Sequence, residues 1–368
     1  MFLKPLEQLL GVTRSELSIV FGLSTVSYTL GANAIPFLFG RLPAWGLILL
    51  STVIGALGML LASQATGIIE LALGYGLLFG VGSGIGFCVA QQCVNLLVAR
   101  HRGLVNGYLI SLFPMGAMLA APLLGWAIAQ FGARLALLGL AALLTASGIL
   151  GIAFIGLSGA RIGDAASGGA SGRFVLQHKA TFWKMFVVFL LAAAAGLTVL
   201  SQAAGIVQAY GGDIGTALAA TTGITAAIAI ARITGGWLVD RLPIPHVAVG
   251  AQLLAVAGAV LLTLVPTVAA CIVAINMIGV GYGLVSGVMA GSVAAYWERN
   301  AYGRIASRMY VAWCIAAISL PVLAARLFDL TDGYQSAIII AGGCSLLAVG
   351  VGALLPRQRL RGEPAGHG

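Results

Sequence analysis

The sequence has very few charged residues, and acidic residues are the scarcest of them. Of 368 residues, 19 are Lys or Arg and 10 are Asp or Glu, so charged side chains make up 8% of the chain. Hydrophobic residues make up 60%, and the mean hydropathy is +1.05. A soluble domain needs a more polar surface than this, so the composition excludes one and indicates a membrane protein.

Sequence patterns typical of disulfides, zinc sites, ATP binding and catalysis are also missing. The five cysteines fall in apolar runs with spacings that suggest neither disulfides nor zinc, and the four histidines fall in polar loops or the tail. There is no Walker sequence, which argues against direct drive by ATP. No cluster of carboxylate, His and Cys side chains supports a membrane enzyme. We therefore expect no enzymatic activity, cofactor or metal.

Long apolar runs, by contrast, fill almost the whole chain. Each has roughly 20 residues, enough to cross about 30 Å of hydrocarbon as a helix. The alternation of polar and apolar residues that a membrane barrel needs is absent. The sequence predicts an all-α polytopic membrane protein with eleven spans. Their ranges are 17–39, 44–63, 71–97, 104–129, 134–157, 183–209, 214–239, 246–265, 268–296, 305–326 and 334–355.

Two short segments near the ends of apolar runs repeat each other. Residues 38–43 read LFGRLP and residues 238–243 read LVDRLP, which indicates an internal duplication of membrane helices. Such duplication is typical of secondary transporters. The first span ends in one copy and the seventh in the other, so the sixth span has no counterpart. We expect that an ancestral first helix is absent, that residues 1–15 form the exposed loop after it, and that a start codon placed too late would explain this.

The spans divide the chain into four regions. We expect an N-terminal helical bundle at 1–157, short of one helix, and a linker at 158–181 that is rich in Gly, Ser and Ala. A six-helix bundle at 182–356 and a tail at 357–368 follow.

Orientation follows from Lys and Arg near the ends of short loops, which favour the cytoplasm. With the N-terminus outside, most basic residues are cytoplasmic, and so are the linker and the tail. The exceptions are Arg232, which lies within a span, and Lys4, Arg14, Arg134 and Arg326. Basic residues scattered over separate loops give no reason to expect nucleic-acid binding. We expect a multi-pass monomer in the inner or plasma membrane.

Arg232 is the one basic residue predicted near mid-membrane. It precedes Asp240 by eight positions, about 12 Å along a helix. Charge at that depth is costly and commonly marks a path for substrate or ions. The alternative is a structural arginine that bonds carbonyls of a neighbouring helix or pairs near the cytoplasmic gate.

None of the acidic residues falls in the middle of a span. An exporter of cations or drugs is expected to hold an acidic group at its binding site, and none is available. An unpaired central cation suits an anion instead. Because the guanidinium of arginine makes two parallel hydrogen bonds to a carboxylate, it fits a small organic acid better than a halide.

The residues around Arg232 resemble a known family. Residues 236–241, GWLVDR, are similar to the loop signature of the major facilitator superfamily, which implies two bundles of six helices. Residues 231–236, ARITGG, are similar to the eighth helix of its monocarboxylate and oxalate/formate branch, as residues 6–18 are to the segment after the first helix. In that branch an arginine binds the substrate carboxylate, and the resemblance implies this role for Arg232. It also implies a gating motif. The motif residues are Gly236, Asp240 and Arg241, with Gly40 and Arg41 in the first copy.

The sequence departs from the family pattern at several places. Gly40 stands where an acidic residue is usual. The lysine that takes part in proton coupling in monocarboxylate carriers lies on the first helix, which we expect to be absent. Residues 310–314 carry no second cation like that of oxalate exchangers, so a monoanion is favoured over a dianion. Proton symport, exchange for a counter-anion, and uniport stay open.

Further candidates for the substrate cavity are polar or aromatic residues at mid-span. They are Tyr28, Asn33, Gln91, Gln92, Asn95, Gln202, Tyr310 and Trp313. Amides in spans often join helices, and aromatic residues often pack, so each has a structural alternative. We expect Gly76, Gly80 and Gly84 to form a packing stripe rather than a nucleotide loop.

The sequence thus predicts a transporter of a small organic anion resembling a monocarboxylate. Two alternatives stay open: a transport-inactive truncated homologue or membrane sensor, and a transporter of another small solute or drug.

Overall fold

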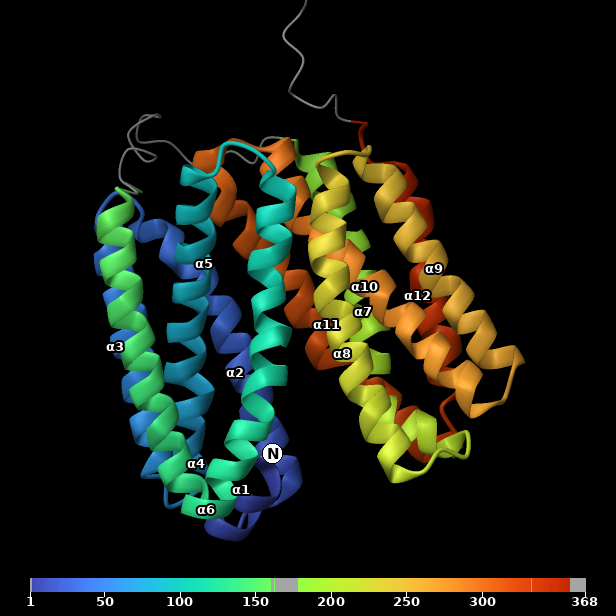
Figure 1. Ribbon diagram of the computed structural model, residues 1–368, viewed down its shortest axis with the longest axis horizontal. Helices are drawn as coiled ribbons and strands as arrows, with labels where there is room; N and C mark the ends of the chain where they lie inside the picture. Colours follow the sequence, from blue (N-terminus) through green and yellow to red (C-terminus); the bar gives the residue numbers. More distant parts are fainter. Residues whose placement is uncertain (1, 160–161, 163–177, 332, 358–368) are drawn as a thin grey trace, which may run out of the picture. The chain divides into compact units, whose positions relative to one another are not determined.

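The computed structural model describes residues 2–159, 162, 178–331 and 333–357, which form a set of helices (Figure 1). The helices are α1 (Leu3–Leu10), α2 (Arg14–Ala34), α3 (Ala44–Ser63), α4 (Ile68–Leu71), α5 (Gly80–Leu97), α6 (Arg102–Ser158), α7 (Lys179–Ala209), α8 (Ile214–Val239), α9 (Ile244–Leu264), α10 (Val268–Tyr296), α11 (Tyr302–Thr331) and α12 (Gln335–Ala353). Short 3-10 turns cover Ile35–Leu38 and Arg299–Ala301, and a π-helix covers Ala72–Phe79.

The predicted spans are confirmed. Within the described residues, ten helices are long and apolar enough to cross a membrane. One of them, α6, has 57 residues and is interrupted at Gly132, where φ is 79° and ψ is 168°. Figure 1 shows the chain reversing its direction within α6, which therefore supplies two of the eleven predicted spans.

Helices are the form that these residues must take in hydrocarbon, because every backbone N–H and C=O has to be bonded within the protein. Large apolar side chains remain on the surface, such as Phe37 at 72% and Leu157 at 85% exposure, as expected for lipid-facing positions. Short polar side chains begin several helices. Thr13, Asp213 and Thr267 accept hydrogen bonds from the first backbone N–H groups of α2, α8 and α10.

The sequence repeat is also a repeat of structure. In the first copy the N–H groups of Arg41 and Leu42 both donate to the Leu38 carbonyl, at 3.0 and 3.2 Å. In the second copy those of Arg241 and Leu242 donate to the Leu238 carbonyl, at 3.0 and 2.7 Å. The same pair of backbone hydrogen bonds therefore ends both segments.

Residues 1–15 are not simply the exposed loop that we expected. They contain the helix α1, and Leu6 on it is only 8% exposed, packed in a cluster with Leu17 and Val20. Apolar residues at helical spacing, Leu6 with Leu9 and Leu10, give α1 one apolar face, which explains why this segment folds. The absence of an ancestral first helix stays a prediction.

The contacts divide the chain into two compact units. Unit 1 comprises Met1–Leu97, Leu119–Phe174 and Arg299–Cys314, and unit 2 comprises Val98–Met118, Val175–Glu298 and Ile315–Gly368. The beginning of α6 thus belongs to unit 2, and the beginning of α11 belongs to unit 1. The predicted boundaries of the bundles stay predictions, and most of the predicted linker and tail lies outside the described residues.

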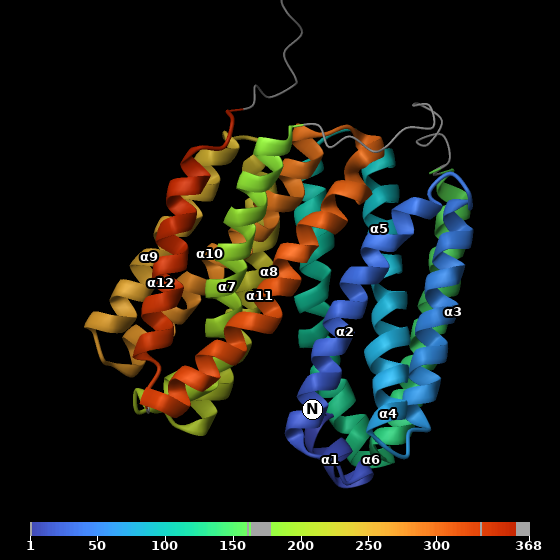
Figure 2. The same cartoon turned by 180° about the vertical axis from the view of Figure 1, so that it is seen from behind.

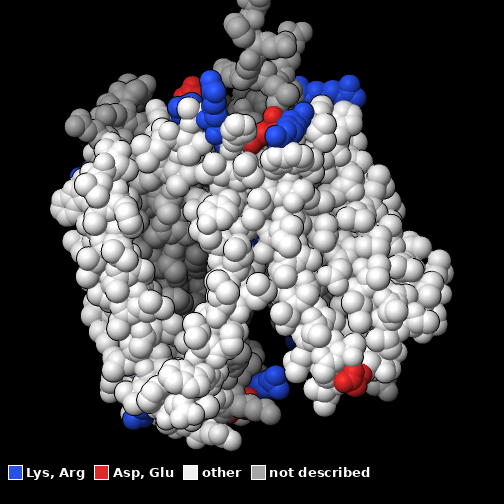
Figure 3. Space-filling model, in the orientation of Figure 1, with Lys and Arg blue, Asp and Glu red and all other residues white. Residues whose placement is uncertain are grey.

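The helices within each unit pack side by side (Figure 2). In unit 1, α5 packs along α2, and α3 covers both α5 and the π-helix. In unit 2, α10 packs between α8 and α9, and α12 packs on α7 and α9. On the face shown in Figure 3, charged side chains lie mostly at the ends of helices, and the sides of the helices are uncharged.

Candidate functional site

Arg232 lies in the second half of α8, within unit 2, and its hydrogen bonds in the described part of the chain go to neutral groups. Its Nη1 donates to the Ile110 carbonyl of α6 at 2.8 Å, and its Nη2 donates to the Tyr282 hydroxyl of α10 at 3.2 Å. The guanidinium carbon lies 5.6 Å from the centre of the Tyr282 ring. Its Nε is buried and has no hydrogen-bond partner. The positive charge is therefore held in place by neutral oxygens.

Glycines bring three helices together around Arg232. A Cβ on Gly107 of α6 or on Gly287 of α10 would overlap the Arg232 carbonyl, and one on Gly236 would overlap the Gly103 carbonyl. These overlaps mean that α6, α8 and α10 touch through their backbones. Small residues permit such close approach between membrane helices. The backbone of α8 at Arg232 is consequently held close to α6 and α10.

Asp240, in the predicted gating motif, binds the start of α6. Its Oδ1 accepts from the Gly103 N–H at 2.8 Å, and its Oδ2 accepts from the Leu104 N–H at 2.9 Å. The first N–H groups of a helix have no partner within the helix and attract a negative group. Arg241, the next residue, lies over the Trp237 ring at 4.0 Å from its centre. Within unit 2, Asp240 therefore ties the end of α8 to the start of α6.

The first copy of the motif has a different backbone conformation, and another residue holds the helix start in unit 1. Gly40 has φ +85°, a conformation that favours glycine, whereas Asp240 has φ −72°. The start of α11 is instead bound by Gln92 of α5, within unit 1. Gln92 accepts from the Gly303 N–H at 2.7 Å and donates to the Arg299 carbonyl at 3.1 Å. A neutral amide thus holds a helix start in unit 1, where a carboxylate holds one in unit 2.

Three of the predicted binding residues come together in unit 1 as an aromatic cluster with Phe87. Tyr28 contacts Trp313 with ring centroids 6.3 Å apart and Phe87 at 5.8 Å, and Phe87 contacts Tyr310 at 5.2 Å. Phe87 was not singled out from the sequence, because a phenylalanine in an apolar run carries no distinguishing signal. Arg232 and Gln202 belong to unit 2.

The predicted amides have varied surroundings. Asn33 donates to the Thr29 and Ser307 carbonyls at 2.9 and 2.8 Å, and Asn95 donates to the Gln91 carbonyl at 2.9 Å. Gln91 is 1% exposed, and its Nε2 has no partner. Gln202 is half-buried on α7. Asn33 and Gln92 therefore join helices, which is the structural alternative for amides in spans.

The glycine stripe packs as expected. A Cβ on Gly80 would lie 2.7 Å from the Ser24 carbonyl oxygen, and one on Gly84 would overlap the Tyr28 carbonyl. The stripe therefore brings α5 against α2, which confirms its interpretation as a packing surface.

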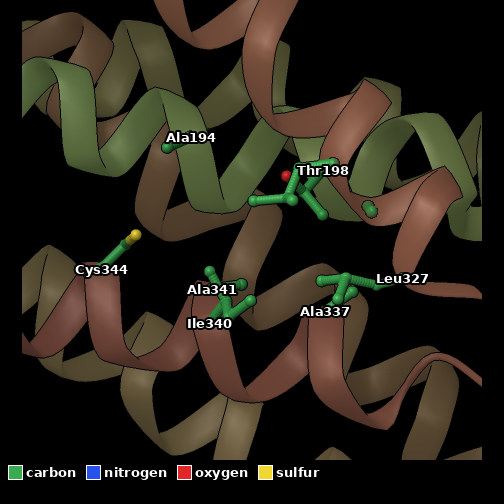
Figure 4. Close-up of a pocket in the computed structure, with 9 residues that line it drawn as sticks. Ala194, Thr198, Leu327, Ala337, Ile340, Ala341 and Cys344 are labelled. Carbon is green, nitrogen blue, oxygen red and sulfur yellow. The ribbon is translucent and has the colours of Figure 1, made fainter. Parts of the chain in front are cut away.

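A small pocket lies in unit 2 between α7, α11 and α12 (Figure 4). Its space, including the part open to the surface, is about 230 Å³, and the Thr198 hydroxyl, which has no hydrogen-bond partner, is among its few polar atoms. Ala194, Ala337 and Cys344 are among the apolar residues that line it. None of the predicted binding residues lines this pocket. Without a charged group in its lining, it does not suit an anion.

Comparison with known proteins identifies the family. Residues 1–321 match the Major Facilitator Superfamily. Monocarboxylate transporter 13 of Bos taurus is 27% identical over 330 residues, which cover 88% of this chain and 76% of that protein. Monocarboxylate transporter 11 of Mus musculus is 28% identical over 345 residues, covering 85% and 73%.

A solved structure agrees in fold. The proton:xylose symporter XylE of the same superfamily superposes with a TM-score of 0.75 at 11% sequence identity, covering 97% of this chain and 91% of that one. The chain belongs to the major facilitator superfamily and resembles its monocarboxylate branch. It is a multi-pass membrane protein that transports small solutes rather than an enzyme.

Proposed function

We propose that the protein carries a small organic anion across the membrane by alternating access and that Arg232 binds the carboxylate. One observation carries the proposal: the Arg232 guanidinium is bonded to two neutral oxygens, while its buried Nε has no partner. A guanidinium with a buried and unused Nε donor is stabilised by an anion at the edge that Nε and Nη2 form.

The arrangement of the donors on this edge of the guanidinium favours a carboxylate. Nε and Nη2 of an arginine point in parallel, so they can donate two hydrogen bonds to the two oxygens of one carboxylate. Nη2 donates to the Tyr282 hydroxyl, which therefore lies beside the edge that meets the anion in this proposal. The names of the two similar mammalian proteins, both monocarboxylate transporters, support the same substrate class.

The other predicted residues take supporting roles in this proposal. Tyr28, Tyr310 and Trp313 stay proposed contacts for substrate, as do Gln91 and Gln202. The contact of Asp240 with the start of α6 supports a gating role for Gly236, Asp240 and Arg241, and Gly40 and Arg41 form the other copy. We place these motifs, the linker and the C-terminus on the cytoplasmic side, in a monomer of the inner or plasma membrane.

Uptake of labelled anions into proteoliposomes tests the proposal. Formate, lactate, pyruvate and oxalate are compared, with internal anion and pH varied to separate exchange from proton symport and uniport. The proposal predicts uptake of at least one monocarboxylate and a loss of at least about tenfold in Arg232→Ala, because a charge-assisted bidentate contact is removed. Full uptake in this variant would make the arginine structural. Binding without uptake would favour a sensor.

A further inference from the structure

The Ile110 carbonyl that meets Arg232 is available because of a proline four residues further along α6. In an α-helix this carbonyl would accept from the N–H of residue 114. Residue 114 is Pro, which has no N–H, so the helix offers Ile110 no such donor. Arg232 Nη1 donates to this carbonyl at 2.8 Å in its place.

The α6 side of the contact is buried. Ile110 is 3% exposed and Pro114 is also buried. An unpaired carbonyl in such a place is unfavourable, so the hydrogen bond from Arg232 has no equivalent replacement from solvent. Gly107, one turn before Ile110, brings the α6 backbone against the α8 backbone at Arg232 and so fixes the separation of the two groups.

The hydrogen bond uses the end of the guanidinium that a carboxylate does not need. Nη1 is held by Ile110, whereas Nε and Nη2 form the opposite edge, where Nε is unpartnered. With Nη1 anchored, the planar group cannot rotate this edge away from a bound anion. A guanidinium that is already held in place loses less conformational freedom when it binds the anion.

We infer that Pro114 is a positioning residue for anion binding: it frees the Ile110 carbonyl, which anchors Arg232 with its Nε and Nη2 edge directed to the substrate carboxylate. This rests on the proposed function of Arg232. Pro114 acts through Arg232 and touches no substrate itself in this scheme.

The variant Pro114→Ala tests the inference. The substituted alanine supplies the missing N–H, so the Ile110 carbonyl bonds within α6 and releases Nη1. The dissociation constant of labelled pyruvate, measured by equilibrium dialysis of the purified protein, is expected to rise about tenfold, because the released guanidinium must lose conformational freedom when it binds the anion. Pro122→Ala is the matched control, because it also removes a proline from α6 but leaves Ile110 without its helical donor. This control should bind as the wild type does.

Thermal unfolding without any anion tests the contact itself. Arg232→Gln should lower the melting temperature more in the wild-type background than in the Pro114→Ala background, where Ile110 no longer needs Arg232. The two substitutions should therefore be non-additive, while Arg232→Gln and Pro122→Ala should be additive. This measurement does not depend on which solute is carried.

The outcomes separate the two proposals. Additive stability effects of Pro114→Ala and Arg232→Gln would overturn the anchoring contact. Tighter pyruvate binding in Pro114→Ala would also overturn the inference, because the carbonyl would then be a competitor of the anion. If the wild type and both proline variants bind none of pyruvate, lactate and formate, the proposed function fails and the positioning role fails with it, even where the unfolding data show the contact.

Discussion

At the scale of single residues, the two helix starts differ in the chemistry that holds them. Asp240 binds the start of α6 with a carboxylate, and Gln92 binds the start of α11 with an amide. The sequence made the Asp240 motif recognisable, but it offered no reason to connect Gln92 with Gly303. That contact joins residues 211 positions apart and becomes visible only in three dimensions.

Asp240→Asn should loosen the start of α6. Each carboxylate oxygen accepts from one N–H, and asparagine keeps only one of these acceptors while it places an NH₂ group against the other donor. We expect faster hydrogen exchange at the Gly103 and Leu104 amides, measured by mass spectrometry of peptides from the start of α6. Unchanged exchange in the variant would show that this contact does not hold the helix.

Gln92→Leu should open the contact at the start of α11. It leaves the Gly303 N–H and the Arg299 carbonyl without the amide, at a cost of about 1–3 kcal/mol for each group that stays buried. Cys88, which is 2% exposed and donates to the Gly303 carbonyl, is a native reporter. Its alkylation by N-ethylmaleimide, followed by mass spectrometry, should become faster.

Gln91→Leu is the matched control for that experiment. Gln91 is the adjacent buried amide, and its Nε2 has no partner to lose. Alkylation of Cys88 should stay near the wild-type rate in this variant. Equal acceleration in both variants would mean that the labelling reports general loosening of α5 rather than loss of the Gln92 contact.

At the scale of elements, the sequence predicted the membrane-spanning helices well, but it predicted the N-terminal segment and the contacts between helices less well. Apolar runs located the spans, because in hydrocarbon a run of that length has no alternative to a helix. Residues 1–15 were expected to be a loop, yet α1 forms there on only a few apolar contacts, around Leu6. A carbonyl of a neighbouring helix was the stated alternative partner of Arg232, but the sequence analysis did not name Ile110, whose carbonyl is left without a helical donor by Pro114.

Gly132→Ala should destabilise the turn inside α6. Gly132 has φ 79° and ψ 168°, a region that only glycine occupies easily, and no atom lies within 4 Å of an added Cβ. The cost is therefore backbone strain alone, about 1–3 kcal/mol. It should appear as a lower melting temperature.

Gly139→Ala is the matched control in the same element. Its added Cβ also meets no atom within 4 Å, and Gly139 lies in the regular helical part of α6. Alanine there should be neutral or stabilising by up to about 1 kcal/mol. If both variants unfold at the same temperature, the turn at Gly132 is not a distinct conformation.

At the scale of the whole molecule, family and fold follow from the sequence match and the helices, whereas the proposed substrate class rests mainly on one side chain. The scarcity of acidic residues in the spans and the central position of Arg232 pointed to an anion before any contact was known. Which groups hold the guanidinium could not be read from the chain, because Ile110 and Tyr282 lie 122 and 50 positions away from it.

Counterflow tests the central claim most directly. Vesicles containing the purified protein are loaded with unlabelled pyruvate or with buffer, and the entry of labelled pyruvate is measured for the wild type and for Arg232→Ala. We predict that internal pyruvate accelerates entry in the wild type and that Arg232→Ala abolishes this acceleration. Folded wild-type protein that binds pyruvate but shows no entry, or equal counterflow in Arg232→Ala, would contradict the claim that Arg232 binds a transported anion.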